Sequence, residues 1–465
     1  MKTNEKKKTL HPLIIICSLV VVAAILTYII PAGQFDRVTD EVTGRTVVVA
    51  NSYQQVESNP VSIGGFLLSF YQGIQGAVNI IAFLMLIGGA FGVINATGAV
   101  AALMSKFIKH FKSENSKYLL IVALFTFFVL CGGTFGMALE GLVFAPFIIM
   151  LMKKLGYDEM LGIAIPVVGS SVGYATAYLN PGSLGIAQGI AELPFTSGIV
   201  LRIIFMIILI VSTSVYFIYY AKKISKDPTK SCCYGNEYEI EEAVIADDTM
   251  TNAQKRVLIV FAGGIAFLIY GTFFKSFFMA QASTVFLFMG IIAGAAYGMK
   301  PGEIAESYTN GVKDMALPCL IVGFARAITL MMENGLIMDT IVHVTTIPLS
   351  NLSPLVSAPL MVVVQTIINF FINSGSAQAV VMMPLIVPIS DILEVNRQVA
   401  VLAYQIGDGL SNMIWITSNL MLVGLGIARV SYAQWVKFAL KIFLFNLVIG
   451  MIVVFVAQYI NWGPF

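Results

Sequence analysis

Two short polar stretches inside apolar sequence decide the fold, Cys131-Gly-Gly-Thr-Phe-Gly136 and Asn373-Ser-Gly-Ser-Ala-Gln378. Each separates two apolar runs that are too short to cross a bilayer, since a transmembrane helix takes about 20 residues. These runs are 117–131, 137–152, 357–372 and 378–390. Two half-length helices joined by small polar residues are typical of a re-entrant hairpin, which enters the membrane and returns. The sequence therefore predicts two such hairpins.

The composition places the whole chain in a membrane. Of its 465 residues, 58% are hydrophobic and only 11% are charged, and the mean hydropathy is +0.87. Soluble domains carry about 25% charged residues, so this chain has too few to cover a surface in water. These values exclude a soluble enzyme, a nucleic-acid binder and a disordered protein. They predict an all-α polytopic membrane protein.

The remaining apolar runs predict nine spans, two of them broken, in addition to the two hairpins. With the N-terminus inside and the C-terminus outside, 21 of the 27 Lys and Arg residues fall on the inner side, as the positive-inside rule requires. The runs are 12–30, 79–97, 159–179, 196–220, 255–274, 281–298, 316–333, a broken run from 396, and 437–460.

The features of the two halves superimpose when one half is shifted along the other. The shift that places Pro146 on Pro384 also places Gly169 on Gly407 and Glu140 on Gln378. Because the two hairpins open toward opposite sides, we expect an inverted repeat with two broken transmembrane helices. The predicted organisation is a tail, first span and outer loop (1–59), a first repeat (60–223) with hairpin 117–153, a cytoplasmic linker (224–254), connecting spans (255–299), and a second repeat (300–465) with hairpin 357–390.

Broken helices expose backbone groups that lipid cannot satisfy, so such breaks line a cavity near the membrane midplane. Four breaks should converge there, and they are rich in Gly, Ser, Thr and Asn. The predicted substrate-binding residues are Gly133, Thr134, Glu140, Asn180, Asn373, Ser374, Ser376, Asp408, Asn412, Thr417 and Ser418, together with Arg326 in a neighbouring span.

Charged residues within spans are costly and usually mark an ion or substrate path. Glu140 and Asp408 could bind a cationic substrate or Na⁺, or take up a proton. Arg326 could bind a substrate carboxylate through its fork of donors, or it could neutralise Glu140 or Asp408. We expect no cofactor other than Na⁺ or H⁺ as a coupling ion, and the candidate Na⁺ ligands are Ser171, Asn180, Ser411 and Asn419.

Other charged residues lie near the ends of the apolar runs. Arg202 and Arg429 are expected to reach the interface by snorkelling. The acidic residues after each hairpin are expected to be solvated, namely Asp158, Glu159, Asp391 and Glu394. Segments 62–77 and 300–315 are moderately amphipathic and predict interfacial helices.

A set of motifs spread along the chain resembles the YfcC family, which is similar to the DcuC-type anaerobic dicarboxylate carriers and to the wider ion-transporter superfamily. The motifs are Ile30-Pro-Ala-Gly33, Gly132-Gly-Thr-Phe-Gly-Met137, Asn180-Pro181 with Gly185-Ile-Ala187, Lys226-Asp-Pro-Thr-Lys-Ser231, Ser374-Gly-Ser376, Gly407-Asp-Gly409 with Asn412, and Thr417-Ser418.

The resemblance implies a secondary transporter of the bacterial inner membrane. It also implies a homodimer, and a transport part that carries both hairpins and moves like an elevator against a scaffold. Family members include arginine–ornithine exchangers and basic amino acid antiporters, whereas the DcuC relatives carry C4-dicarboxylates. Members often have two consecutive Glu after Gly-Met-Ala in the first hairpin, but this chain has Leu139 followed by Glu140.

The function predicted from residues and resemblance together is secondary active transport of a small polar solute across the lipid bilayer, with no nucleic-acid partner. An amino acid is the first expectation, through exchange of basic amino acids or cation-coupled uptake, because two intramembrane carboxylates outnumber one arginine. A C4-dicarboxylate carrier is the alternative within this class. A channel is a further alternative, and a membrane-embedded enzyme is not expected because no catalytic set lies in the spans.

Overall fold

The structure, a computed structural model, describes residues 12–39, 46–49, 52–100, 102–103, 113–194, 197–235, 250–275 and 279–463. The described chain is helical apart from four strands of two or three residues. The first half contains α1 (Pro12–Ile29), α2 (Ile63–Gly76), α3 (Val78–Ala96), α5 (Glu114–Phe135), α6 (Ala145–Lys154), α7 (Glu159–Ala175), α8 (Leu184–Ile190) and α9 (Ile199–Lys226), with 3₁₀ turns η1 (Glu140–Phe144) and η2 (Pro228–Lys230).

The second half repeats the pattern after two connecting helices. It contains α10 (Asn252–Lys275), α11 (Met279–Tyr297), α12 (Pro301–Asp314), α13 (Ala316–Asn334), α14 (Met338–Thr346), α15 (Pro354–Phe371), α16 (Gly375–Ile392), α17 (Arg397–Ser411), α18 (Asn419–Ala428) and α19 (Tyr432–Tyr459), with the 3₁₀ turn η3 (Ile347–Asn351).

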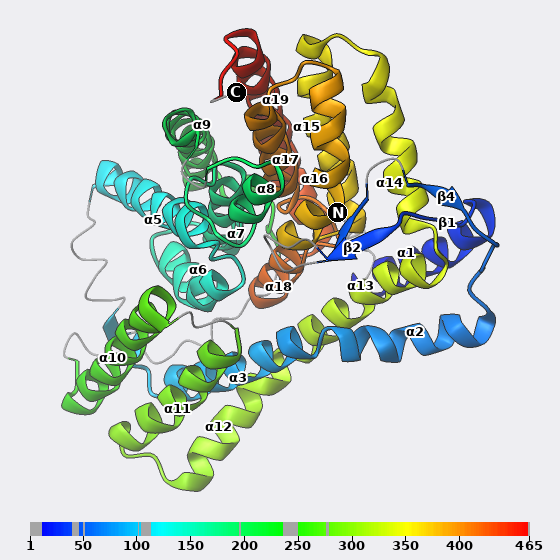
Figure 1. Cartoon of the computed structure of the whole chain (residues 1–465). Helices are drawn as coiled ribbons and strands as arrows, with labels where there is room; N and C mark the ends of the chain where they lie inside the picture. The colour runs from blue at the N-terminus through cyan, green and yellow to red at the C-terminus, as the bar shows by residue number, and fades with distance from the viewer. Residues whose placement is uncertain are drawn as a thin grey trace, which may run out of the picture.

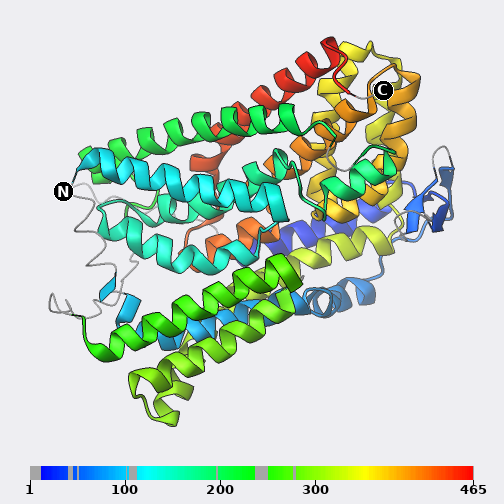
Figure 2. The ribbon, with the colours of Figure 1, turned by 60° about the vertical axis from the view of Figure 1, so that its left-hand side comes forward.

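The helices form two layers (Figures 1 and 2). One layer gathers α5 to α9 with α15 to α19, and the other gathers α1 to α3 with α10 to α13. Helix α13 packs on α1, α2 and α3 and also meets α18 of the other layer. The contact with α18 is close, since a Cβ atom built on Gly426 would lie 2.4 Å from Cγ of Pro318.

Corresponding helices recur at the shift that places Pro146 on Pro384. Under this shift both ends of α2 fall on the ends of α12, and both ends of α3 fall on the ends of α13. The first residue of α7 likewise falls on the first residue of α17. The two predicted amphipathic segments are thus helices, α2 and α12, and each leads directly into an apolar helix through a single residue, Ala77 or Met315.

The chain reverses at both predicted hairpin breaks. A Cβ atom built on Gly141 would lie 3.2 Å from the ring of Phe128, and Gln378 Nε2 donates to Gln365 Oε1 at 2.8 Å. In both cases a residue after the break lies beside one before it, so each break folds the second arm back on the first. Helix α5 ends at Phe135 and is capped by Gly136, whose φ of +70° favours glycine, so most of the predicted first break is helical.

Seven of the described helices are long and apolar enough to cross a membrane by length and composition: α3, α5, α9, α13, α15, α16 and α19. Three of them are arms of the predicted hairpins. Helix α5 has 22 residues, and α15 and α16 have 18 each, so these arms are longer than their apolar runs predicted. The helices extend past those runs because polar residues such as Glu114 and Thr134 continue the helical backbone. Helices α7 and α18 are shorter and apolar, as are the stretches Leu13–Ile29 within α1 and Ser283–Tyr297 within α11.

The four strands lie in the loop between α1 and α2. Strand β1 (Gly33–Gln34) pairs with β4 (Gln54–Gln55), and β2 (Arg37–Thr39) pairs with β3 (Thr46–Val48). This loop is fastened to α14, because the Asp339 carboxylate accepts the Phe35 amide at 3.0 Å and Arg37 Nη2 at 2.8 Å.

Candidate functional site

The first hairpin turn lies against the break that follows α7. The Gly133 carbonyl accepts the amides of Tyr178 and Leu179, both at 3.2 Å, and the hydroxyls of Thr134 and Tyr178 are 2.5 Å apart. Asn180 Oδ1 accepts the Gly182 amide at 2.9 Å and so shapes the turn into α8. The predicted residues Gly133, Thr134 and Asn180 are therefore brought together by the fold.

The second hairpin turn lies in the same way against the break that follows α17. Asn373 Nδ2 donates to Asn412 Oδ1 at 3.0 Å, and Asn412 Nδ2 donates to the Asp408 carbonyl at 2.9 Å. Asn369 Nδ2 donates to Ser411 Oγ at 2.7 Å and to the Asp408 carbonyl at 3.1 Å. Sequence reasoning missed Asn369, although an amide inside the apolar run 357–372 was a usable signal.

The two broken helices meet across the halves of the chain. Gln405 Nε2 of α17 donates to the Tyr174 carbonyl of α7 at 2.8 Å and to Ser183 Oγ at 2.9 Å. The Tyr404 hydroxyl donates to the Gly375 carbonyl at the start of α16. The fold thus joins α7, the turn before α8, α16 and α17 at one place.

Asp408 lies at this junction. The residue is fully buried, and neither carboxylate oxygen has a hydrogen-bond partner in the described part of the chain. A Cβ atom built on Gly375 would lie 2.9 Å from Asp408 Oδ2 and 3.2 Å from Cβ of Ser183. The carboxylate therefore faces the N-terminal end of α16 and the turn before α8, where helix dipoles favour negative charge.

Glu140 begins η1, just after the first hairpin turn, and is partly exposed. Its Oε2 accepts the amide of Ala138 at 3.3 Å. No ion pair to Glu140 or Asp408 occurs among the described residues, so Arg326 does not neutralise either of them. That alternative for Arg326 is wrong, because Arg326 instead lies 3.7 Å from Glu333, two turns further along α13.

A cavity of about 580 Å³ is lined by some of the other predicted polar residues. Its lining includes Arg326 and Thr417, the second hairpin turn (Asn373, Ser374), and Asn419 of α18. Glu140 and Asp408 are not among its lining residues. Three further charged residues line the cavity and were not predicted from the sequence: Arg37, Glu333 and Asp339. They lie near the ends of their helices or strand, where charged residues are ordinarily solvated.

Two other predicted serines, Ser418 and Ser376, lie at the N-terminal ends of helices. Ser418 is the N-cap of α18, and its hydroxyl accepts the Met421 amide at 3.5 Å. Ser376 lies in the first turn of α16, where its hydroxyl is 3.3 Å from that of Ser374.

The four candidate Na⁺ ligands lie in separate local arrangements. The Ser171 hydroxyl donates within its own helix to the Val167 carbonyl, and that of Ser411 donates to the Gly407 carbonyl. Asn180 shapes its turn, while Asn419 lines the cavity. Among the described residues, no hydrogen bond joins two of these four side chains.

Three charged residues differ from their predicted exposure. Arg202 is fully buried rather than snorkelling, and its Nη1 donates to the Ala177 carbonyl at 3.2 Å, just past the end of α7. Asp158 and Glu159 are 8% and 5% exposed rather than solvated. Burial of the Asp158 carboxylate is tolerated because Oδ1 caps α7 and Oδ2 accepts the hydroxyls of Tyr220 and Ser231. Glu159 Oε2 lies 3.7 Å from Lys153 Nζ. Arg429 is exposed, as expected.

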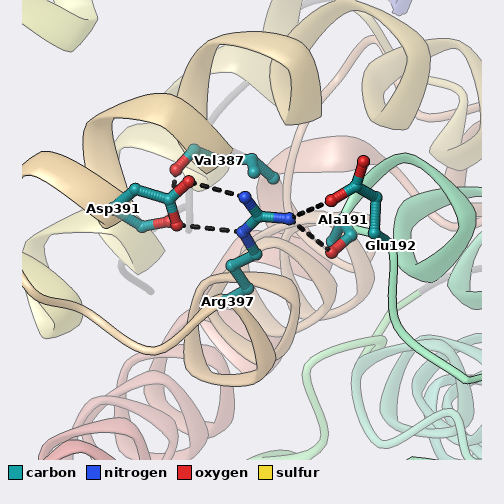
Figure 3. Close-up of polar contacts among 6 residues, drawn as sticks. Ala191, Glu192, Val387, Asp391 and Arg397 are labelled. Atoms are coloured by element: carbon teal, nitrogen blue, oxygen red, sulfur yellow. Dashed lines mark hydrogen bonds and ion pairs between the residues drawn. The ribbon is translucent and has the colours of Figure 1, made fainter. Parts of the chain in front are cut away.

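A second tie between the halves lies at the end of α16 (Figure 3). Arg397 donates two parallel hydrogen bonds to Asp391, at 2.9 and 2.8 Å, and its Nη1 donates to Glu192 at 2.6 Å. Asp391 is in the last turn of α16 in the second half, whereas Glu192 follows α8 of the first half. One guanidinium therefore fastens the first-half break to the second-half hairpin.

Comparisons with known proteins identify the family of the chain. A family model described as C4-dicarboxylate anaerobic carrier, DcuC, matches residues 11–459. A protein of Escherichia coli (strain K12) named "Putative basic amino acid antiporter YfcC" is 31% identical over 489 residues, which cover 97% of this chain and 96% of the relative. An uncharacterized protein of Haemophilus influenzae is 26% identical over 505 residues, covering 98% of this chain and 99% of the relative.

Two solved transporter structures are also similar. The Alcanivorax borkumensis YdaH transporter matches with a TM-score of 0.40 and 17% identity, over 98% of this chain and all of that one. Neisseria gonorrhoeae MtrF, from a class of antimetabolite efflux pumps, matches with a TM-score of 0.44 and 18% identity, over 99% of this chain and 98% of that one. The family match spans nearly the whole sequence, and the chain therefore belongs to the DcuC family of multi-pass membrane transporters and is not an enzyme.

Proposed function

We propose that this transporter carries an amino acid with a net positive charge, by exchange or by cation-coupled uptake. The observation that carries this proposal is Asp408, whose carboxylate is fully buried and has no hydrogen-bond or ionic partner among the described residues. Charge inside a protein is costly unless it is paired, so such a carboxylate needs a proton or a cation.

Two kinds of cation could meet this need during a transport cycle. One is the cationic group of the substrate, and the other is Na⁺ or H⁺ as the coupling ion. The Glu140 carboxylate, just after the first hairpin turn, supplies a second acid for the same purpose. The name of the Escherichia coli relative, a basic amino acid antiporter, also favours a cationic substrate.

The proposed mechanism is alternating access of the elevator type. It is supported by the recurrence of helices at one shift between the halves, by the reversal of the chain at both hairpin turns, and by the two layers of helices. In this proposal the layer with α5 to α9 and α15 to α19 carries the hairpins and moves. The other layer is the scaffold, and the two halves are inverted repeats with the bounds given above.

The proposed setting is the bacterial inner membrane, with the N-terminus in the cytoplasm and the C-terminus outside, because 21 of the 27 basic residues then lie inside. We also propose that two copies of the chain form a homodimer through their scaffold layers. This part of the proposal rests on the family resemblance.

A C4-dicarboxylate is the second candidate substrate. The observation that favours it is the cavity, where Arg37 and Arg326 lie near the polar turns of the second half. The family description names the same class of solute. In that case the two carboxylates would bind the coupling ions instead of the substrate.

Counterflow in proteoliposomes tests the two candidates. Vesicles are loaded with an unlabelled solute and diluted into a trace of the labelled one, using L-arginine, L-ornithine, L-lysine, succinate and fumarate in turn. We expect transient accumulation of a basic amino acid above equilibrium, which a channel cannot produce, and its loss in Asp408→Asn. Counterflow of succinate alone, with loss in Arg326→Gln, would favour the second candidate, and full activity of Asp408→Asn would contradict the role given to that carboxylate.

A further inference from the structure

The cavity of about 580 Å³ contains two acid–base pairs that are held very differently. Arg37 and Asp339 are hydrogen-bonded to each other and to the loop after α1: Arg37 Nη2 lies 2.8 Å from Asp339 Oδ1, and Arg37 Nη1 donates to the Phe35 carbonyl at 3.2 Å. Asp339 is only 5% exposed. This pair serves the fold.

The other pair is loosely held. Arg326 Nη1 and Glu333 Oε1 are 3.7 Å apart, beyond hydrogen-bond distance, and neither side chain makes a hydrogen bond with the described residues. The side chains are 40% and 45% exposed. The stem of Arg326 lies along Gly76, where an added Cβ atom would be 3.3 Å from Cγ. The arginine is thus positioned by packing, while its donors and the Glu333 carboxylate remain available.

Polar groups of the second half line the same cavity. Thr417 is 6% exposed, yet its hydroxyl has no partner in the described part of the chain. Asn419 is the first residue of α18, and Ser374 is the N-cap of α16, so the N-terminal ends of two helices border the cavity. Free amides and the helix dipole there favour a carboxylate.

We propose that Arg326 and Glu333 form the site for the head group of an amino acid. The substrate carboxylate lies between the Arg326 guanidinium of α13, in the scaffold layer, and the Thr417 hydroxyl of the moving layer, and the α-ammonium is received by Glu333. The site therefore forms only while the two layers are arranged as they are in this structure. This inference rests on the proposed function and names a specificity-determining residue, Glu333, for it. A zwitterion inserted here replaces one weak ion pair with two, whereas the second carboxylate of a dicarboxylate would be repelled by Glu333.

Three arginine analogues test the inference with the purified full-length protein. L-Arginine has both charges of the head group, agmatine lacks the carboxylate, and Nα-acetyl-L-arginine lacks the ammonium. Binding is measured by titration calorimetry to wild type, Glu333→Gln and Arg326→Gln. The control is Glu306→Gln, an exposed acid on α12 outside the cavity, and size-exclusion profiles and melting temperatures without ligand show whether each variant is folded.

We expect wild type and Glu306→Gln to bind L-arginine at least tenfold more tightly than either analogue. Glu333→Gln should bind L-arginine and Nα-acetyl-L-arginine about equally, while still preferring L-arginine to agmatine. Arg326→Gln should bind L-arginine and agmatine about equally, while still preferring L-arginine to Nα-acetyl-L-arginine. Wild-type preferences retained in Glu333→Gln would overturn the inference and leave the proposed function standing. Binding of succinate and of no arginine analogue by wild type would overturn the proposed function and this inference with it.

Discussion

Gly409 of α17 lies so close to Ala175 of α7 that a Cβ atom built on Gly409 would be 2.1 Å from the Ala175 amide nitrogen. The two broken helices therefore cross with their backbones almost in contact, one residue after the buried Asp408. Any side chain at position 409 would separate the two breaks and displace the carboxylate from the N-terminal end of α16.

Gly409→Ala is expected to destabilise the protein by about 1–3 kcal/mol, because overpacking of a tight contact forces the backbone to move. Transport should fall at least tenfold. The melting temperature in detergent and counterflow measure the two effects. Gly263→Ala is the matched control, because nothing lies within 4 Å of a Cβ atom at that position of α10. Equal behaviour of the two variants would contradict the close crossing.

Asp408→Asn and Glu140→Gln are each expected to abolish or strongly impair transport while the protein stays folded and inserted. For Asp408→Asn the melting temperature should be unchanged or raised, since the substitution removes a buried charge that has no partner in the described chain. Glu140→Gln keeps an oxygen that can accept the Ala138 amide. Normal uptake by both variants would show that the carboxylates are not required.

Arg397→Lys is expected to lower stability by about 1 kcal/mol, because an ammonium cannot replace the two parallel hydrogen bonds to Asp391. The two acidic partners raise the pKa of the Arg397 guanidinium further above its usual value, so the tie stays charged at any ordinary pH. High salt should weaken it, because the pairs are partly exposed.

A double-mutant cycle with Glu192→Gln and Arg397→Gln measures the tie between the halves directly. We expect a coupling free energy of about 0.5–1 kcal/mol in thermal unfolding. The control cycle combines Glu192→Gln with Arg429→Gln, and it should show no coupling because the exposed Arg429 guanidinium pairs with Asp314 on α12. Additive effects in the first cycle would mean that Arg397 and Glu192 do not interact.

Asp158→Ala is expected to release the start of the linker from the base of α7. It removes the acceptor for Ser231 and Tyr220, each loss worth about 1–3 kcal/mol. Cys233 is 4% exposed, and burial raises the pKa of its thiol, so it should react slowly with a maleimide in the wild type. The variant should label at least tenfold faster, as followed by peptide mass spectrometry.

Asp227→Asn is the control for this experiment, because Asp227 lies in the same linker but bonds only locally, to Thr229 and Lys230. Rapid labelling of Cys233 in the wild type, or no acceleration in Asp158→Ala, would contradict the anchoring role of Asp158.

Local sequence was sufficient to predict that the chain turns near each of the two polar stretches. Gly132–Gly136 and Asn373–Gln378 were predicted as breaks because small residues tolerate sharp backbone changes. In the structure α5 continues to Phe135 and turns at Gly136, and only residues 372–374 separate α15 from α16. The shift between the halves came from the order of such features, and α2, α3 and α7 recur at it. The hairpin arms were predicted too short, since apolar runs measure contact with lipid and not the full helical length.

The sequence by itself determined that this is a helical membrane protein and which small polar residues interrupt its apolar runs, because these properties depend on composition and on local backbone chemistry. That it is a transporter followed from its resemblance to a family. Only the tertiary structure decided which charges are paired and which are buried. Arg326 lies beside Glu333 and not beside Asp408, Arg202 is inside, and Asn369 supports the second break. Such outcomes depend on which helices are neighbours in space, and no local pattern in a chain of 465 residues specifies that.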